Sequence, residues 1–151
     1  MKMFLTGLLF AALALPAGDP DGFHYWSAAE LKGYSKSLAP KMDAGKLASQ
    51  PFFTHGNAGF QIAHREANGQ AEWHEKHADV FFVQTGSATL VYGGEVVDGK
   101  TTAPNEIRGP SIKGGMEKKL SAGDVVTIPA KTAHWLKVDK EFTYFVVKVA
   151  Q

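Results

Sequence analysis

Residues 72–86 read EWHEKHADVFFVQTG, and this stretch decides both the fold and the candidate chemistry. Side chains two positions apart on a β-strand point to the same face, so Glu72 and His74 share one face. Asp79 opens a run of β-branched and aromatic residues that predicts a second strand. A tight turn over residues 75–78 would bring His74 and Asp79 together across the strand pair.

A second stretch, residues 123–135, reads GDVVTIPAKTAHW. Its glycine and proline flank a short run with strand composition, and His134 follows at the mouth of another expected strand pair. His134 can therefore supply a third metal ligand beside His74 and Asp79. Two histidines and one carboxylate with open positions form the ligand set of non-haem iron and catalytic zinc sites, and sets richer in carboxylate also suit manganese.

Together the two stretches resemble the two motifs of the cupin superfamily. The first motif reads His-x-His, three or four residues, Glu, six residues and Gly. The second reads Gly, five residues, Pro, four residues and His. Counting back from Gly86 places Asp79 at the Glu position, and His74 and Glu72 then take the second and first His positions. Two of the four ligand positions thus differ in type from the family, but both keep an oxygen ligand.

The resemblance covers residues 72–138 and implies a mainly β fold. This fold is a cupin-type β-barrel, also called a double-stranded β-helix or jelly roll, with a short N-terminal helix before it. The resemblance also implies a divalent metal ion, either iron, manganese or zinc, bound by Glu72, His74, Asp79 and His134. Proteins that look like this include dioxygenases, isomerases and lyases that act on small organic substrates. In the second motif, Ala130-Lys131 and Val138 depart from the family pattern.

The rest of the chain fits one β-domain behind an N-terminal arm. Ser27 and Glu30 match a capping box and predict a helix over residues 27–38, which Pro40 stops. Residues 98–110 contain two prolines and two glycines without a period, and are expected to form the longest loop. The expected strands are residues 60–65, 71–74, 80–84, 87–92, 111–120 with an irregularity at the Gly114-Gly115 pair, 125–128, 133–138 and 142–149.

The N-terminus has the layout of a secretory signal peptide. Lys2 precedes an apolar run over residues 3–15 that is too short to span a bilayer, and small residues follow it. We therefore expect residues 1–18 to be a cleaved signal peptide, residues 19–50 an arm and helix, and residues 51–151 the barrel. The mature protein would be exported, periplasmic or secreted, and not bound to a membrane. The alternative is an N-terminal helix packed in the core, but the run has no polar face.

The amino-acid composition limits the kinds of partner that this protein can bind. The 151 residues include no cysteine, which excludes disulfides and thiolate chemistry, and the net charge of +1 gives no basic surplus for binding nucleic acid. A small-molecule ligand or substrate is the expected partner. A homodimer is expected by analogy with the family, because sheet edges and the aromatic arm residues Phe23, Tyr25 and Trp26 gain from being covered.

Several assignments stay open at the level of sequence. Three function classes remain: a metal-dependent enzyme, a non-catalytic small-ligand-binding module and a structural protein. The catalytic residues are unknown, because no base or nucleophile is recognisable beyond the metal group. His77 lies in the expected turn and favours solvent, whereas His64 can face either the barrel interior or water. Glu72 can be a ligand or a solvated carboxylate at a strand edge.

Overall fold

The computed structural model describes residues 18–151. The signal peptide predicted for residues 1–18 therefore lies, apart from Gly18, outside the described residues and stays a prediction. The elements in chain order are α1 (Ala28–Leu38), the 3-10 helix η1 (Ala39–Lys41), β1 (Leu47–His55), β2 (Ala58–Arg65), β3 (Ala71–His74), β4 (His77–Tyr92), β5 (Glu95–Val97), β6 (Lys100–Ala103), β7 (Glu106–Gly109), β8 (Ser111–Lys113), β9 (Met116–Ser121), β10 (Val125–Ile128), β11 (His134–Lys137) and β12 (Phe142–Ala150).

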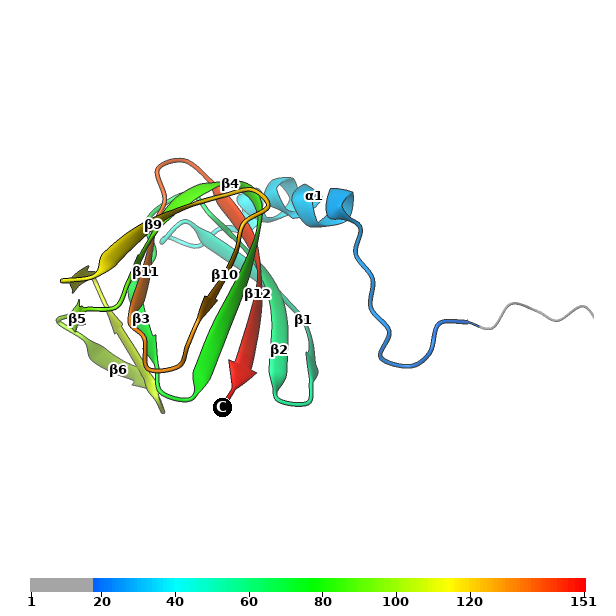
Figure 1. Ribbon diagram of the computed structural model, residues 1–151. Coiled ribbons are helices and arrows are strands. Elements are labelled where there is room, and N and C mark those ends of the chain that lie inside the picture. The colour runs from blue at the N-terminus through cyan, green and yellow to red at the C-terminus, as the bar shows by residue number, and fades with distance from the viewer. Residues whose placement is uncertain (1–17) are drawn as a thin grey trace, which may run out of the picture.

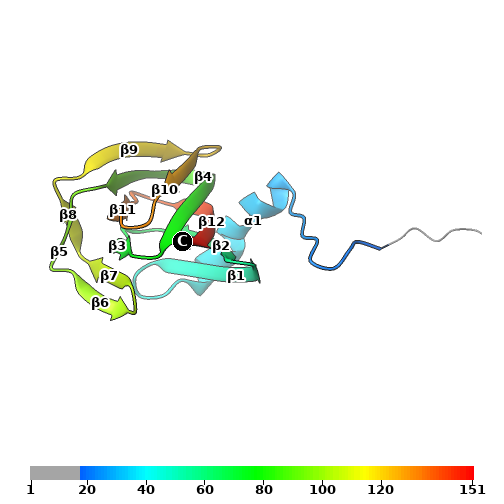
Figure 2. The same cartoon turned by 60° about the horizontal axis from the view of Figure 1, so that its bottom comes forward.

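The strands form a curled antiparallel barrel, as the mainly β prediction requires (Figure 1). Ten strands belong to one sheet with the order β1-β2-β12-β4-β11-β3-β7-β6, and β9 and β10 pair with β4 beside this path. β5 and β8 pair separately. Together with β6 and β7 they lie on the side of the barrel away from α1 (Figure 2). Curling of this kind leaves an interior that inward-facing side chains line.

Strand β4 joins the two walls of the barrel. Its first half pairs with β12 and β10, and its second half pairs with β11 and β9. The change of wall occurs at Gly86, whose φ of +75° favours glycine and whose missing Cβ would collide with the carbonyl oxygen of Glu141. The sequence predicted two strands here, residues 80–84 and 87–92. The structure has one continuous strand, because the glycine bends the strand without ending it.

Two apolar cores lie on opposite faces of the β1-β2-β12 wall. Side chains alternate along β2, so Ala63 faces the barrel interior and Ile62 faces the helix. The inner core is formed by Ala63, Phe81, Val83, Ala88, Leu90, Leu120, Ile128, Leu136, Val138, Phe142, Tyr144 and Val146. In the outer core, Leu38 of α1 is fully buried against Ile62 and the ring of Phe52. The helix therefore closes the outside of the wall that carries the inner cavity.

The predicted helix and its capping box are both present. Ser27 Oγ accepts a hydrogen bond from the Glu30 amide at 3.2 Å, and the Glu30 carboxylate accepts one from the Ser27 amide at 2.7 Å. A cap of this kind stabilises a helix by about 1 kcal/mol. Within residues 18–151, no helix is long and apolar enough to cross a membrane.

The prediction that residues 98–110 form a loop was wrong. The segment contains β6 and β7, joined by a turn at Pro104-Asn105 in which Asn105 has a φ of 65°. These strands are short, and all four residues of β6 are exposed, so they show no apolar alternation in the sequence. They form because β7 pairs with β3 along its whole length. Residues 111–120 likewise form two strands, β8 and β9, which separate at the glycine pair.

Candidate metal centre

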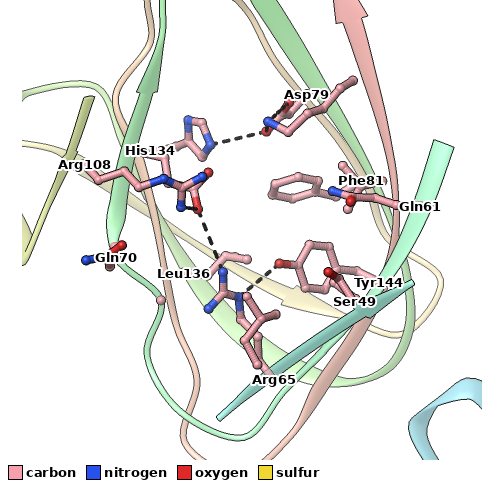
Figure 3. A pocket seen from close by; sticks show the side chains of 16 residues that line it. Ser49, Gln61, Arg65, Gln70, Asp79, Phe81, Arg108, His134, Leu136 and Tyr144 are labelled. Atoms are coloured by element: carbon pink, nitrogen blue, oxygen red, sulfur yellow. Dashed lines mark hydrogen bonds and ion pairs between the residues drawn. The ribbon is translucent and has the colours of Figure 1, made fainter. Parts of the chain in front are cut away.

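A cavity of about 330 Å³ lies inside the barrel and is lined by both walls (Figure 3). Its lining includes Leu47, Ser49, Gln61, Ala63, Arg65, Gly69, Gln70, Glu72, Asp79, Phe81, Arg108, His134, Leu136, Tyr144, Val146 and Lys148. One end of this cavity holds polar and charged side chains near the β3–β4 connection. The C-terminus lies at the same end, where the amide of Gln151 donates to the carbonyl of Lys76 at 2.9 Å.

The structure brings together the four residues that the sequence grouped. Glu72 and His74 are two positions apart on β3 and share one face, and Asp79 follows on β4. The prediction that these two strands pair directly was wrong, because β11 lies between them and pairs with both. His134 is the first residue of β11 and lies opposite Glu72 in the sheet. One ligand atom from each of these four residues lies within 4.8 Å of all the others. A divalent ion needs donor atoms that converge in this way.

The closest approaches within the group are made by the imidazole Nε2 atoms. His74 Nε2 lies 3.3 Å from Asp79 Oδ2 and 3.4 Å from Glu72 Oε2. His134 Nε2 lies 3.5 Å from Asp79 Oδ2. The side chains of Asp79 and both histidines are almost fully buried, so this cluster is shielded from solvent. Water therefore competes little for the donor atoms.

Hydrogen bonds at the far side of each ring orient both imidazoles. His134 Nδ1 donates to the carbonyl oxygen of Thr132 at 3.0 Å, and His74 Nδ1 contacts the carboxylate of Glu106. A carbonyl can only accept, so the neutral ring of His134 carries its lone pair on Nε2. Outer hydrogen bonds of this type fix the tautomer and orientation of histidines that bind metals. Both Nε2 atoms consequently face the centre of the group.

The residues present fit a divalent metal ion. His134 Nε2 is buried and has no hydrogen-bond partner among the described residues, although it faces the two carboxylates and the second imidazole. An unsatisfied buried acceptor is costly, and a ligated metal would satisfy it. Two imidazole nitrogens with two carboxylate oxygens suit Fe²⁺ and Mn²⁺, and zinc sites use the same donor types.

Lys148 belongs to the same cluster and was missed by the sequence analysis. Its Nζ lies 3.0 Å and 3.2 Å from the two carboxylate oxygens of Asp79 and 3.0 Å from His74 Nε2. A signal was available, because Lys148 shares a face of β12 with the buried residues Tyr144 and Val146. A lysine in register with buried apolar residues indicates a charged group directed into the barrel.

The electrostatics of the cluster keep both carboxylates ionised. Burial disfavours the charge on Glu72, but the hydrogen bond from His74 and the charge of Arg108 outweigh burial and lower the pKa of Glu72 to about 2. Asp79 is buried too, but the two imidazoles and the ammonium group of Lys148 hold its pKa well below the usual range. For His74, burial is outweighed by the hydrogen bonds to the two carboxylates, which raise its pKa to about 9.

The other histidines lie outside this group. His77 begins β4 with 39% of its side chain exposed, and its Nδ1 lies 4.0 Å from Glu106 Oε1. His64 faces neither the cavity nor water. It is buried on the opposite face of β2, where its Nδ1 shares a hydrogen bond of 2.8 Å with Thr143 Oγ1.

Two arginines complete the charged lining of the cavity and were also missed. Arg108, on β7, lies opposite Glu72 on β3, and its Nη1 donates to Glu72 Oε1 at 2.7 Å. Arg65, the last residue of β2, donates from Nε to the hydroxyl of Tyr144 at 3.1 Å. The side chain of Glu72 is mostly buried and ion-paired, so it is not a solvated carboxylate at a strand edge.

Comparison with solved structures places this barrel among known folds. The TT1209 protein from Thermus thermophilus is 18% identical with a TM-score of 0.53, over 76% of this chain and 92% of that chain. KdgF from a Halomonas species is 15% identical with a TM-score of 0.51, over 70% and 80%. A cupin-2 domain protein, Rru_A2000 from Rhodospirillum rubrum, is 14% identical with a TM-score of 0.51, over 70% and 61%.

No protein-family model matches the sequence, and no curated protein matches it significantly. Similarities below 25% identity show a shared fold and carry no statement about activity. The predicted fold agrees with these neighbours. The curled antiparallel barrel and the likeness to a cupin-2 domain structure show that this chain has a cupin-type fold, as the motifs in residues 72–86 and 123–135 predicted.

Proposed function

We propose that this protein is a metal-dependent enzyme that binds Fe²⁺ or Mn²⁺ through Glu72, His74, Asp79 and His134. Its substrate is a small organic molecule held in the barrel cavity. The observation that carries the proposal is the orientation of the two imidazoles. Each has its Nδ1 hydrogen-bonded on the outside of the cluster and its Nε2 directed at the carboxylates.

The cavity supports substrate binding beside the group of four. Phe81, Leu136 and Val146 give it an apolar middle, and Gln61 and Ser49 add polar groups. Pockets for small ligands have this combination of apolar walls and a few polar groups that fix orientation. A bound metal would supply Lewis acidity and open positions for a substrate or for oxygen. The chain itself would orient the substrate and exclude bulk water.

Metal content and turnover test the proposal together. The purified protein is loaded with Fe²⁺, Mn²⁺ or Zn²⁺, and bound metal is measured by equilibrium dialysis and elemental analysis. Oxygen consumption with the iron form would indicate a dioxygenase. Conversion of small organic acids by the manganese form without oxygen, followed by NMR, would indicate an isomerase or lyase. The matched control is His134→Ala, which removes one ligand from the end of a strand.

The possible outcomes separate the function classes. Stoichiometric metal with turnover that is lost in His134→Ala supports the proposal. Metal binding and small-molecule binding without turnover across the panel would favour the ligand-binding module. No binding of any of the three metals would overturn the metal centre itself.

A further inference from the structure

Arg65 is a buried cation at the end of the cavity away from Asp79 (Figure 3). Its side chain is only 9% exposed. Charged side chains are seldom buried to this extent unless they are paired. The nearest carboxylate oxygen is Glu72 Oε1, which lies 3.9 Å from Arg65 Nη2 and only 2.7 Å from Arg108. Arg108 therefore holds this carboxylate more closely, and Arg65 makes only a long ion pair with it, without a hydrogen bond.

The guanidinium of Arg65 is held in place, and its two outer nitrogen atoms are available to donate hydrogen bonds. Nε donates to the hydroxyl of Tyr144, whereas Nη1 and Nη2 make no hydrogen bond within residues 18–151. The guanidinium packs against Gly69, where an added Cβ would come within 3.1 Å of Nη1. Gly69 is fixed in turn, because its amide donates to Leu136 and its carbonyl accepts from the indole of Trp135. The fork is thus preorganised and lines the cavity.

The charged side chains that line the cavity also favour an anionic ligand. The chain contains only two arginines, Arg65 and Arg108, and both line this one cavity together with Lys148. Two carboxylates, those of Glu72 and Asp79, also line it. A divalent ion in the proposed centre would neutralise both carboxylates and displace the ammonium group of Lys148, which leaves the two arginines as cations around the remaining space. Such a cavity attracts anions.

We propose that Arg65 binds the carboxylate of a small organic acid, with the rest of that acid extending along the cavity toward Glu72, His74, Asp79 and His134. The inference rests on the proposed function, since it names the substrate class of the same cavity. Arginine binds carboxylate through two parallel N–H donors, and Nη1 and Nη2 provide such a fork.

The separation of the two ends sets the size of the acid. Arg65 Nη2 lies 3.9 Å from Glu72 Oε1, and the other oxygen of that carboxylate, Oε2, lies 3.4 Å from His74 Nε2. The guanidinium is therefore close enough to the proposed metal ligands for a short acid to reach both. The side chains of Phe81, Leu136 and Val146 lie between the two ends. A short chain with an apolar segment next to its carboxylate fits this space.

Binding of propionate to the full-length protein tests the inference, with propionamide as the neutral isostere and phosphate as a competing oxyanion at equal ionic strength. Affinity is measured by ligand-observed NMR. We expect propionate to bind at least about tenfold more tightly than propionamide, because the neutral amide loses the charge-assisted fork. Propionate should also bind more tightly than phosphate, because phosphate lacks the apolar segment that packs against Phe81, Leu136 and Val146. Equal binding of propionate and propionamide would overturn the inference, and so would tighter binding of phosphate.

Variants locate the site. Arg65→Gln should reduce propionate affinity at least about tenfold. Arg65→Lys keeps the charge but loses the fork and should also bind more weakly. The control Lys137→Gln removes a cation that pairs with Glu117 outside the cavity and should leave affinity unchanged. Unchanged binding by both Arg65 variants would overturn the inference.

A measurement on the unaltered protein guards against a folding failure of these variants. Labelling arginine with ¹⁵N gives side-chain signals from two residues only. Propionate should shift the Nε–H signal of Arg65 more than that of Arg108, and absence of any shift in the Arg65 signal would contradict the inference.

Each titration is done with EDTA and again with Mn²⁺, which separates the two proposals. Propionate binding to Arg65 without metal binding would leave this inference standing and remove the proposed metal function. Stoichiometric Mn²⁺ without propionate binding would remove this inference alone.

Discussion

The ammonium group of Lys148 lies 3.0 Å from Nε2 of His74, in the space toward which the candidate metal ligands converge. It also lies 3.0 Å from Asp79 Oδ1, so it balances the charge of the buried carboxylate. An ammonium group and a divalent ion repel each other at this distance, and burial strengthens the repulsion. Metal binding thus requires the ammonium group of Lys148 to move, and the Lys148 side chain is already 31% exposed.

Lys148→Met should therefore raise Mn²⁺ affinity by about tenfold, since it removes a competing cation from the cluster. Without metal, the same variant leaves Asp79 buried and less well paired, so its midpoint of thermal unfolding should fall and recover when Mn²⁺ is added. Dialysis and calorimetry measure the two effects. Lys137→Met is the control, because Lys137 pairs with Glu117 on the surface. Weaker Mn²⁺ binding by Lys148→Met would show that the ammonium group supports the metal.

Removal of a proposed ligand should reduce metal affinity, whereas removal of His77 should not. His74→Ala and His134→Ala each delete one converging nitrogen, and we expect Mn²⁺ affinity to fall by an order of magnitude or more. His77→Ala deletes an imidazole that lies outside the group of four. Equilibrium dialysis on the three variants decides between them. Loss of metal in His77→Ala with retention in His74→Ala would contradict the assignment of the ligands.

Glu106 should affect metal binding without touching the metal. Its carboxylate contacts Nδ1 of His74 and fixes the direction of the opposite nitrogen, Nε2. Glu106→Ala should lower Mn²⁺ affinity by about 10- to 100-fold, the usual effect of losing an outer hydrogen bond to a ligand histidine. Glu106→Gln keeps an acceptor for Nδ1–H and should restore part of the affinity. Equal losses in the two variants, measured by dialysis, would mean that charge and not orientation is what Glu106 contributes.

The sequence predicts those residues of this site that lie close together along the chain, but not those that come from distant strands. Glu72, His74 and Asp79 lie on the consecutive strands β3 and β4, so side-chain alternation and a short connection are enough to group them, although β11 lies between these two strands in the sheet. Glu106 and Lys148 come from strands that reach the cluster only through the pairing of β7 with β3 and of β12 with β4. Periodicity shows which face a residue shares with its neighbours, but it does not show which distant strand lies opposite.

The fold likewise has parts that the local sequence predicts and parts that depend on pairing with a distant strand. The strand boundaries at residues 71–74 and 125–128 agree with the prediction, because each run is apolar or alternating and ends at a polar residue or proline. The hairpin of β6 and β7 could not be predicted, since its exposed residues carry no pattern and its stability comes from β3.

Export is the proposal that follows from residues 1–18. A cleaved signal peptide would leave a mature chain that begins near residues 15–19. Expression of the full sequence in a bacterium that secretes proteins, followed by intact-mass measurement of the exported fraction, gives the N-terminus directly. Deletion of residues 3–15 should leave the protein in the cytoplasm. Recovery of exported protein that still includes Met1 would contradict the proposal.

The protonation of His74 should make metal binding depend on pH. In the metal-free protein the carboxylates of Asp79 and Glu72 raise the pKa of His74 to about 9, above its ordinary value of 6.5, so the folded protein binds a proton on this ring at neutral pH. A metal ion takes only the neutral imidazole and must displace that proton. Mn²⁺ affinity should therefore rise about tenfold for each pH unit between 6.5 and 8.5. An ordinary imidazole would give a flat profile above about 7.

The raised pKa of His74 also makes the stability of the metal-free protein depend on pH. Because the pKa of His74 is higher in the folded state than in the unfolded state, the stabilisation is fully present below pH 6.5 and is lost as the pH rises through about 9. Urea unfolding of the metal-free protein at several pH values measures this loss, and His74→Gln should lack it. With saturating Mn²⁺ the ring is neutral across the range, so the decline in stability between pH 6.5 and 9 should disappear. A decline that persists in His74→Gln would assign the titration to another group.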